Sequence, residues 1–232
     1  MHNELTTFDY DGFAANLLSA AYDGFVTLQR HHPQENFYVY AFYASPTYSH
    51  LFASANSEAA LTRAARAYIK QDRGRGWYAG LNETDVRLLL RNLAADWEYH
   101  CFSADMPAFE AASRAFSAGA RWYERVVHRE GSLDEDEAWD IMRAYLARIR
   151  GICAAVLSTL DQQGIFGDAN QRKASVLTLM VGEAPLEERL HWAAQLNPPD
   201  VVTRYAVELE AASTIGAIVA ANMQNGLFTD KS

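Results

Sequence analysis

Glu98, Tyr99 and His100 form a dense group of titratable side chains, with Trp97 and Cys101 on either side. A carboxyl group and an imidazole near a cleft can carry out acid–base chemistry. On a strand, Glu98 and His100 would share one face and Cys101 would lie on the other, which is also typical of a core cysteine beside a hydrogen-bonded histidine. We expect that structural role, and we keep Trp97, Glu98, Tyr99 and His100 as an alternative pocket.

A second candidate site is an acidic cluster. It consists of Asp134, Glu135, Asp136, Glu137 and Asp140. Carboxylates gather at helix N-termini because the helix dipole favours them there, and this is the structural interpretation of the cluster. The same residues could bind a basic protein, so we take them as a candidate partner-binding surface. Their spacing does not match the calcium-binding EF-hand, and we predict neither a metal nor a cofactor.

Familiar catalytic and phosphate-binding motifs are missing from the sequence. It contains no GxSxG, HExxH, GxxxxGK[ST] or GxGxxG pattern. Cys101 and Cys153 lack metal-ligand spacing and are expected to be buried free thiols. The motifs therefore give no catalytic residue, and the sequence favours a protein that is not an enzyme.

Composition narrows the class of protein further. The 232 residues include 20 basic and 29 acidic side chains, for a net charge of −9. Nucleic-acid binding needs a basic surface, so this class is disfavoured. No apolar run reaches the roughly 20 residues that span a bilayer, and the N-terminus does not resemble a signal peptide. We expect a cytoplasmic protein of one domain, residues 1–232, ordered from about 5 to 224 with a short C-terminal tail.

The elements that must position these residues are organised around Phe37–Asn56. Residues 37–43 predict a strand that is apolar on both faces, with Tyr38, Tyr40 and Phe42 on one of them, and therefore central in its sheet. Ser45-Pro46-Thr47 predicts a turn and residues 48–55 a returning strand. Asn56 is the expected N-cap of the next helix.

Other segments add helices and short strands. Apolar periodicity predicts helices over about 7–30, from Asp105-Pro107 to Gly131, after a Ser132–Glu135 capping box, from Pro185 to Leu196, and from an Asn197 cap to about Ala221. A strand is predicted at Ser175–Val181. Val86–Leu90 could be a strand or a short helix, and we favour the strand. Residues 96–103 are expected as a strand or a segment packed on the sheet. The fold class is α+β: a small, mainly antiparallel sheet built on the 37–56 hairpin, flanked by several long helices.

Three strings in this order resemble a bacterial family known as domain of unknown function 4303. They are Phe37–Leu61, Asp96–His100 and Glu187–Tyr205, and the resemblance spans roughly Leu5 to Ala221. Where the family has an acidic, often Gly-Asp-Pro-like turn, this chain reads Gly182-Glu183-Ala184-Pro185. The resemblance implies no catalytic residues, because none are established for the family.

Small acidic bacterial domains of this kind are often suspected immunity proteins for secreted toxins, and this analogy guides the functional hypothesis. We expect a non-enzymatic binding protein, most concretely an immunity protein that neutralises a basic protein toxin by direct binding. The alternative is an enzyme or small-molecule binder with a site around Glu98, Tyr99 and His100. A self-associating module, with a large apolar surface on the last two helices, is a third possibility. The sequence indicates no oligomeric state.

Overall fold

A four-stranded sheet lies at the centre of the protein. The computed structural model describes residues 5, 7–44, 47–72, 75–101, 107–181 and 185–229. The strands lie in the order β3-β2-β1-β4. Their bounds are β1 (Phe37–Ala44), β2 (Leu51–Ser57), β3 (Tyr99–His100) and β4 (Val176–Val181). The predicted central position of the first strand is therefore confirmed.

Strand direction makes the sheet mixed. β1 pairs antiparallel with β2, and β2 pairs antiparallel with β3. β1 and β4 run parallel, with Val39 opposite Val176 and Ala44 opposite Val181. The α+β class is confirmed, and one parallel pairing joins the antiparallel ones that the sequence predicted. Parallel neighbours need a long crossover, which the helices between β1 and β4 provide.

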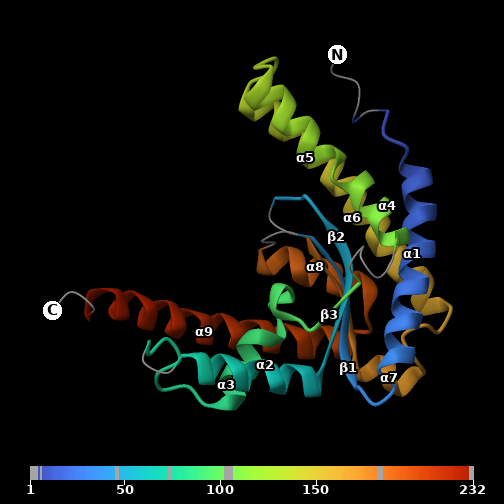
Figure 1. Cartoon of the computed structure of the whole chain (residues 1–232). Helices are drawn as coiled ribbons and strands as arrows, with labels where there is room; N and C mark the ends of the chain where they lie inside the picture. The colour runs from blue at the N-terminus through green and yellow to red at the C-terminus, as the bar shows by residue number, and fades with distance from the viewer. Residues whose placement is uncertain are drawn as a thin grey trace.

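Helices cover both faces of the sheet (Figure 1). The core on one face includes side chains of α1 (Tyr10–His31), α4 (Pro107–Phe116) and α6 (Glu135–Gln162). The core on the other includes side chains of α2 (Glu58–Gln71), α3 (Glu83–Arg91) and α9 (Pro199–Thr229). The remaining helical elements are a 3₁₀ turn (Ala94–Asp96), α5 (Ala118–Tyr123), a π-helix (Glu124–Arg129), α7 (Ala169–Ala174) and α8 (Leu186–Leu196). No described helix has both the length and the apolar character that crossing a membrane requires.

A bulge at Tyr38 decides which core each side chain of β1 enters. Phe37 pairs with Ser57 and Val39 pairs with Asn56, so Tyr38 is the extra residue. Tyr40 enters the core beneath α1 and α6, whereas Tyr38 and Val39 enter the opposite core. The prediction that Tyr38 shares a face with Tyr40 was wrong, because the bulge reverses the alternation there.

Two predicted helix caps fall on a neighbouring residue. Asn56 is the buried penultimate residue of β2, and its amide donates to the Tyr38 hydroxyl at 3.0 Å. Ser57 caps α2 instead, accepting from the Ala60 amide. Asp134, and not Ser132, caps α6, so the predicted capping box does not form.

Other boundaries also differ from the predicted ones. Residues 86–90 belong to α3, which the Asn82 and Asp85 capping box begins, so the favoured strand was wrong and the short-helix alternative is confirmed. Residues 107–129 form α4, α5 and the π-helix in succession rather than one α-helix. α9 continues to Thr229, beyond its predicted end. The predicted roles of Ser45, Pro46, Asp105 and residues 182–184 lie outside the described residues.

The outer edge of β4 is covered by a side chain. The Asn197 amide accepts from the Leu177 N–H at 2.8 Å and donates to the Leu177 carbonyl at 2.7 Å. The buried guanidinium of Arg172 donates to Asp161 at 2.6 Å and to the carbonyl oxygen of Leu196 at 3.2 Å. Asn197 was predicted to cap α9, but these contacts place its side chain along the sheet edge instead.

Candidate functional site

Two cavities lie side by side at the C-terminal end of α1, and His32 lines both. The first, of about 390 Å³, lies between the end of α1, the start of β1 and the 164–167 loop. The second, of about 450 Å³, lies between α1 and β3. Its lining residues are Thr27, Leu28, His31, His32, Glu98, Tyr99, His100 and Cys101. The structure therefore brings three of the four alternative-pocket residues to one cavity.

A polar network joins the two cavities. Arg63 donates to Glu98 through Nε at 3.0 Å and Nη2 at 2.8 Å, and Nη2 also reaches Glu35 Oε1 at 3.1 Å. The Tyr99 hydroxyl donates to the same Glu35 oxygen at 2.8 Å, and Ser57 donates to Oε2. Two carboxylates thus share one guanidinium, which leaves the network with one excess negative charge.

The protonation states in this network follow from burial and hydrogen bonding. Burial alone would raise the pKa of Glu35, but hydrogen bonds from Ser57, Tyr99 and Arg63 outweigh it and lower that pKa. Burial, followed by the hydrogen bond to Glu35, raises the pKa of Tyr99 to about 12. At neutral pH the network therefore holds an ionised Glu35 and a neutral Tyr99 phenol.

Residues 97, 100 and 101 are each held in place by burial or hydrogen bonds. His100 Nδ1 lies 2.8 Å from the Ser54 hydroxyl, and burial lowers the pKa of His100. Burial raises the pKa of the Cys101 thiol to about 12, so this group is not a thiolate nucleophile at neutral pH. Trp97 lies in the opposite core, where its indole donates to the Arg91 carbonyl at 3.2 Å, and it lines neither cavity.

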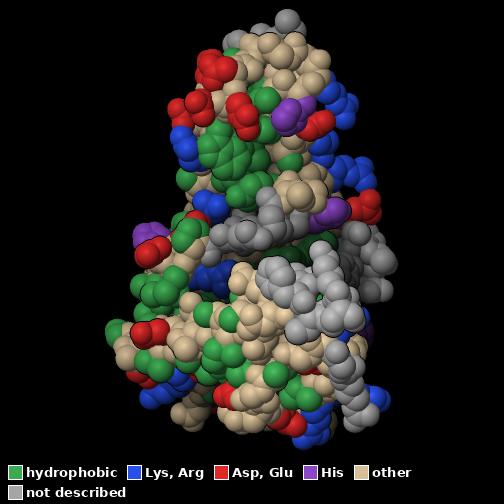
Figure 2. All heavy atoms as spheres, turned by 90° about the vertical axis from the view of Figure 1, so that its left-hand side faces the viewer, with side chains coloured by type: hydrophobic (Ala, Val, Ile, Leu, Met, Phe, Trp, Pro, Cys, Tyr) green, Lys and Arg blue, Asp and Glu red, His purple; other side chains and the backbone are tan. Residues whose placement is uncertain are grey.

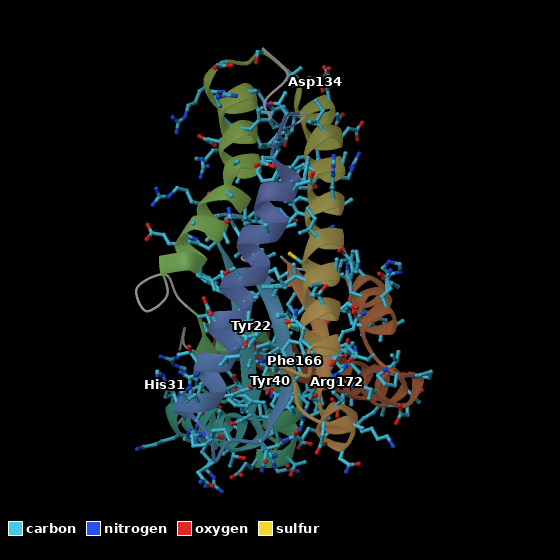
Figure 3. All side chains as sticks on the ribbon, turned by 90° about the vertical axis from the view of Figure 1, so that its right-hand side faces the viewer. Tyr22, His31, Tyr40, Asp134, Phe166 and Arg172 are labelled. Carbon is cyan, nitrogen blue, oxygen red and sulfur yellow. The ribbon has the colours of Figure 1, made fainter. Side chains whose placement is uncertain are left out.

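The acidic cluster lies far from these cavities. Figure 3 places Asp134 at one end of α6, and Tyr40 and Phe166 near its other end. We call residues 118–142, which form α5, the π-helix and the start of α6, the arm. The five carboxylates of the acidic cluster lie on the arm and are exposed. Asp134 caps α6 through the Glu137 amide at 2.9 Å, and of these five only Asp140 forms an ion pair with a described residue, Arg143.

Comparison with known proteins identifies the family. A family profile described as "Domain of unknown function (DUF4303)" matches residues 17–198. The chain belongs to this family. Searches of curated proteins and of solved structures returned no match. The DUF4303 match includes both cavities and the arm, whereas α9 begins one residue beyond it.

The arm of this DUF4303 domain also has a basic flank. Arg121, Arg125 and Arg129 line a cavity of about 380 Å³ beside Trp122. Arg125 lies 3.6 Å from Glu130, and Arg129 lies 3.7 Å from Glu124. Figure 2 shows acidic side chains gathered on one flank at the top of the molecule and basic ones on the other. The carboxylates of residues 134–137 are therefore the part of the arm that attracts cations.

Sequence reasoning missed His32, Glu35 and Arg63 as members of one site. Glu35 and Arg63 are separated by both strands of the hairpin, and only the folded hairpin places them together. The sequence signal was limited to His31 and His32 at a predicted helix end. Among the described residues, no group of three His, Cys, Asp or Glu side chains is placed to hold a metal ion.

Proposed function

We propose that this DUF4303 domain is a cytoplasmic, non-catalytic binding protein whose partner is a basic protein, most concretely a toxin that it neutralises as an immunity protein. The observation that carries the proposal is the exposed acidic end of the arm. Glu135, Asp136 and Glu137 are consecutive and exposed, and none of them forms an ion pair with a described residue. A partner can therefore reach these carboxylates without first displacing a cation of the domain.

Electrostatics would act mainly on association. The net charge of −9 gives the whole molecule a field that attracts a basic partner, and the acidic end of the arm concentrates that field. Charge complementarity can raise association rate constants well above the 10⁵–10⁶ M⁻¹s⁻¹ of neutral pairs at low salt. Affinity would come from the half-buried Tyr123 and Trp139 beside the cluster, whose rings pack edge to face with centroids 5.8 Å apart.

The test begins with the protein encoded beside this one, produced with and without the domain. We expect growth arrest by the neighbour alone, rescue on co-expression and a purified complex. The triple variant E135K/D136K/E137K should lower the association rate constant by about 10-fold or more and weaken its salt dependence. Asp134 is left unchanged because it caps α6.

The matched control applies the same change in total charge elsewhere. The triple variant D23K/E187K/E210K replaces three exposed acidic residues on α1, α8 and α9. If the two triple variants slow association equally, only net charge matters and the arm is not the binding surface. If the neighbour forms no complex with the domain and is not neutralised by it, the proposed function is wrong.

A second candidate function is favoured by the 450 Å³ cavity, which Glu98, Tyr99 and His100 line together. The lowered pKa of His100 leaves a neutral imidazole that could act as a general base on a bound small molecule. The same growth assay separates the two functions. A binding protein should retain rescue in the His100→Gln variant, whereas an enzyme that detoxifies by catalysis should lose it.

A further inference from the structure

We propose that the 390 Å³ cavity at the end of α1 binds an organic cation, namely an ammonium or guanidinium group carried on an alkyl chain. The cavity lies between Pro33–Tyr40 and the 164–167 loop, at the opposite end of α6 from the arm. The inference concerns a site separate from the proposed partner surface and does not depend on the toxin.

The charge of the cavity is the first argument. Among the described residues that line it, Glu35 is the one acidic side chain, and there is no lysine or arginine. Arg63 lies just outside and is shared between Glu35 and Glu98, so it does not fully neutralise Glu35. The lining also includes the imidazole of His32. A bound anion would meet an ionised carboxylate with no lysine or arginine in the lining to offset it, and a bound cation would be attracted.

Glu35 also has room for one more hydrogen-bond donor. Its Oε1 accepts from Tyr99 and Arg63, whereas Oε2 accepts from Ser57 alone. A carboxylate offers about four acceptor positions, so one position on Oε2 remains. The side chain is 15% exposed, and Glu35 lines the cavity, so a ligand N–H group can approach it. Charge-assisted hydrogen bonds of this kind are short and strong.

Aromatic rings form the second part of the site. Phe37, Tyr40 and Phe166 line the cavity together, and the Tyr40 ring centroid lies 5.6 Å from that of Phe37 and 4.7 Å from that of Phe166. Tyr40 and Phe166 appear close together in Figure 3. Such a wall suits the alkyl chain of an organic cation and adds attraction between the cation and the rings.

The cavity is held open by its own contacts. Gln29 donates to the Tyr40 hydroxyl at 3.0 Å and to the Ile165 carbonyl at 2.8 Å, which ties α1 to the loop. Gly167 has a φ of 97°, and a Cβ there would lie 2.7 Å from Cβ of Gln171. Only glycine fits that backbone position without displacing Gln171. A ligand therefore meets a pre-formed site and does not have to order one.

The direct test is titration of the whole protein with three probes, followed by amide NMR. The probes are agmatine, Nα-acetyl-arginine methylamide and the neutral Nα-acetyl-citrulline methylamide. We expect the two guanidinium probes to shift the Gly164 and Gly167 backbone amides and the Gln29 side-chain amide, and the citrulline probe to bind at least about 10-fold more weakly. If agmatine binds and Nα-acetyl-arginine methylamide does not, the ligand class is a small free cation. If both guanidinium probes bind, the site is open to a basic side chain of a protein. Absence of shifts from both guanidinium probes up to about 10 mM, or equal binding of the citrulline probe, overturns the inference.

Two variants at an exposed rim position keep the test independent of folding. Ala174 lines the cavity, is exposed and ends α7, so either charge is tolerated there. Ala174→Lys should weaken agmatine binding by about 3-fold or more and Ala174→Glu should tighten it by a similar factor. If the agmatine affinity changes in the same direction in both variants, the inference is overturned. Glu35→Gln should reduce affinity by about 10-fold or more, and the E135K/D136K/E137K variant should bind agmatine as the unmodified protein does.

Discussion

Replacing Asn197 with alanine tests how the edge of the sheet is stabilised. The Asn197 side chain contributes both an acceptor for the Leu177 N–H and a donor to the Leu177 carbonyl, as a paired strand would. It also donates to the Ala193 carbonyl at 2.8 Å and accepts from Arg172 Nη2 at 3.3 Å. Alanine keeps the backbone but removes all four contacts, because the methyl group neither donates nor accepts.

The expected magnitude follows from the groups left unpaired. Leu177 is fully buried, so its N–H and carbonyl would lose partners where water has little access. A buried polar group without a partner costs about 1–3 kcal/mol, so two such groups give about 2–6 kcal/mol. Water entering the vacated space would favour the lower end, and we expect a loss of at least about 2 kcal/mol. Against a total stability of roughly 5–15 kcal/mol, the effect would be large.

Urea denaturation followed by circular dichroism measures this loss. The midpoint should fall while the slope of unfolding free energy against urea stays the same, because the surface exposed on unfolding changes little. Asn170→Ala is the matched control, since that residue is exposed and its side chain makes no hydrogen bond to a described residue. If Asn197→Ala costs less than about 0.5 kcal/mol, as surface substitutions do, the edge does not depend on this amide.

Two further predictions concern glycine packing and the buried thiols. Gly119→Ala should destabilise the protein by about 1–3 kcal/mol because a Cβ there would lie 2.7 Å from Cδ1 of Tyr145. Gly151→Ala should stabilise it by about 0.5–1 kcal/mol, because that residue lies on an exposed helix face and its Cβ would meet nothing within 4 Å. Thermal melts measure both changes, and melting temperatures that move in the same direction for the two variants would contradict this prediction. Burial raises the pKa of both Cys101 and Cys153 to about 12, so their contribution to stability is complete below the unfolded thiol pKa of about 8.5 and is lost as pH rises toward 12. The urea midpoint should therefore fall between pH 7 and 9.5, and it should fall less in the double cysteine-to-alanine variant; an equal fall would refute the assignment.

Local signals explain which elements the sequence could predict. The first hairpin strand was predictable because apolar side chains on both faces are typical of a central strand. α3 was left open between a strand and a short helix because its short apolar run, Val86–Leu90, matches either. A helix signal was present, since Asn82 and Asp85 have the spacing of a capping box, and the structure shows both of its hydrogen bonds. The parallel β1–β4 pairing had no comparable signal, because it depends on how the intervening helices cross the sheet.

The candidate site was less predictable than the fold, and the bulge at Tyr38 shows why. With regular alternation from Tyr40, Phe37 would face the α2 and α3 core. The bulge turns Phe37 to the α1 side, where its ring centroid lies 5.3 Å from that of Tyr99 and 5.6 Å from that of Tyr40. Because both faces of this strand are apolar, the hydrophobic pattern could not fix that register. The aromatic wall of the 390 Å³ cavity therefore arises from an irregularity that the residue pattern does not specify, although the same pattern does specify the position of the strand.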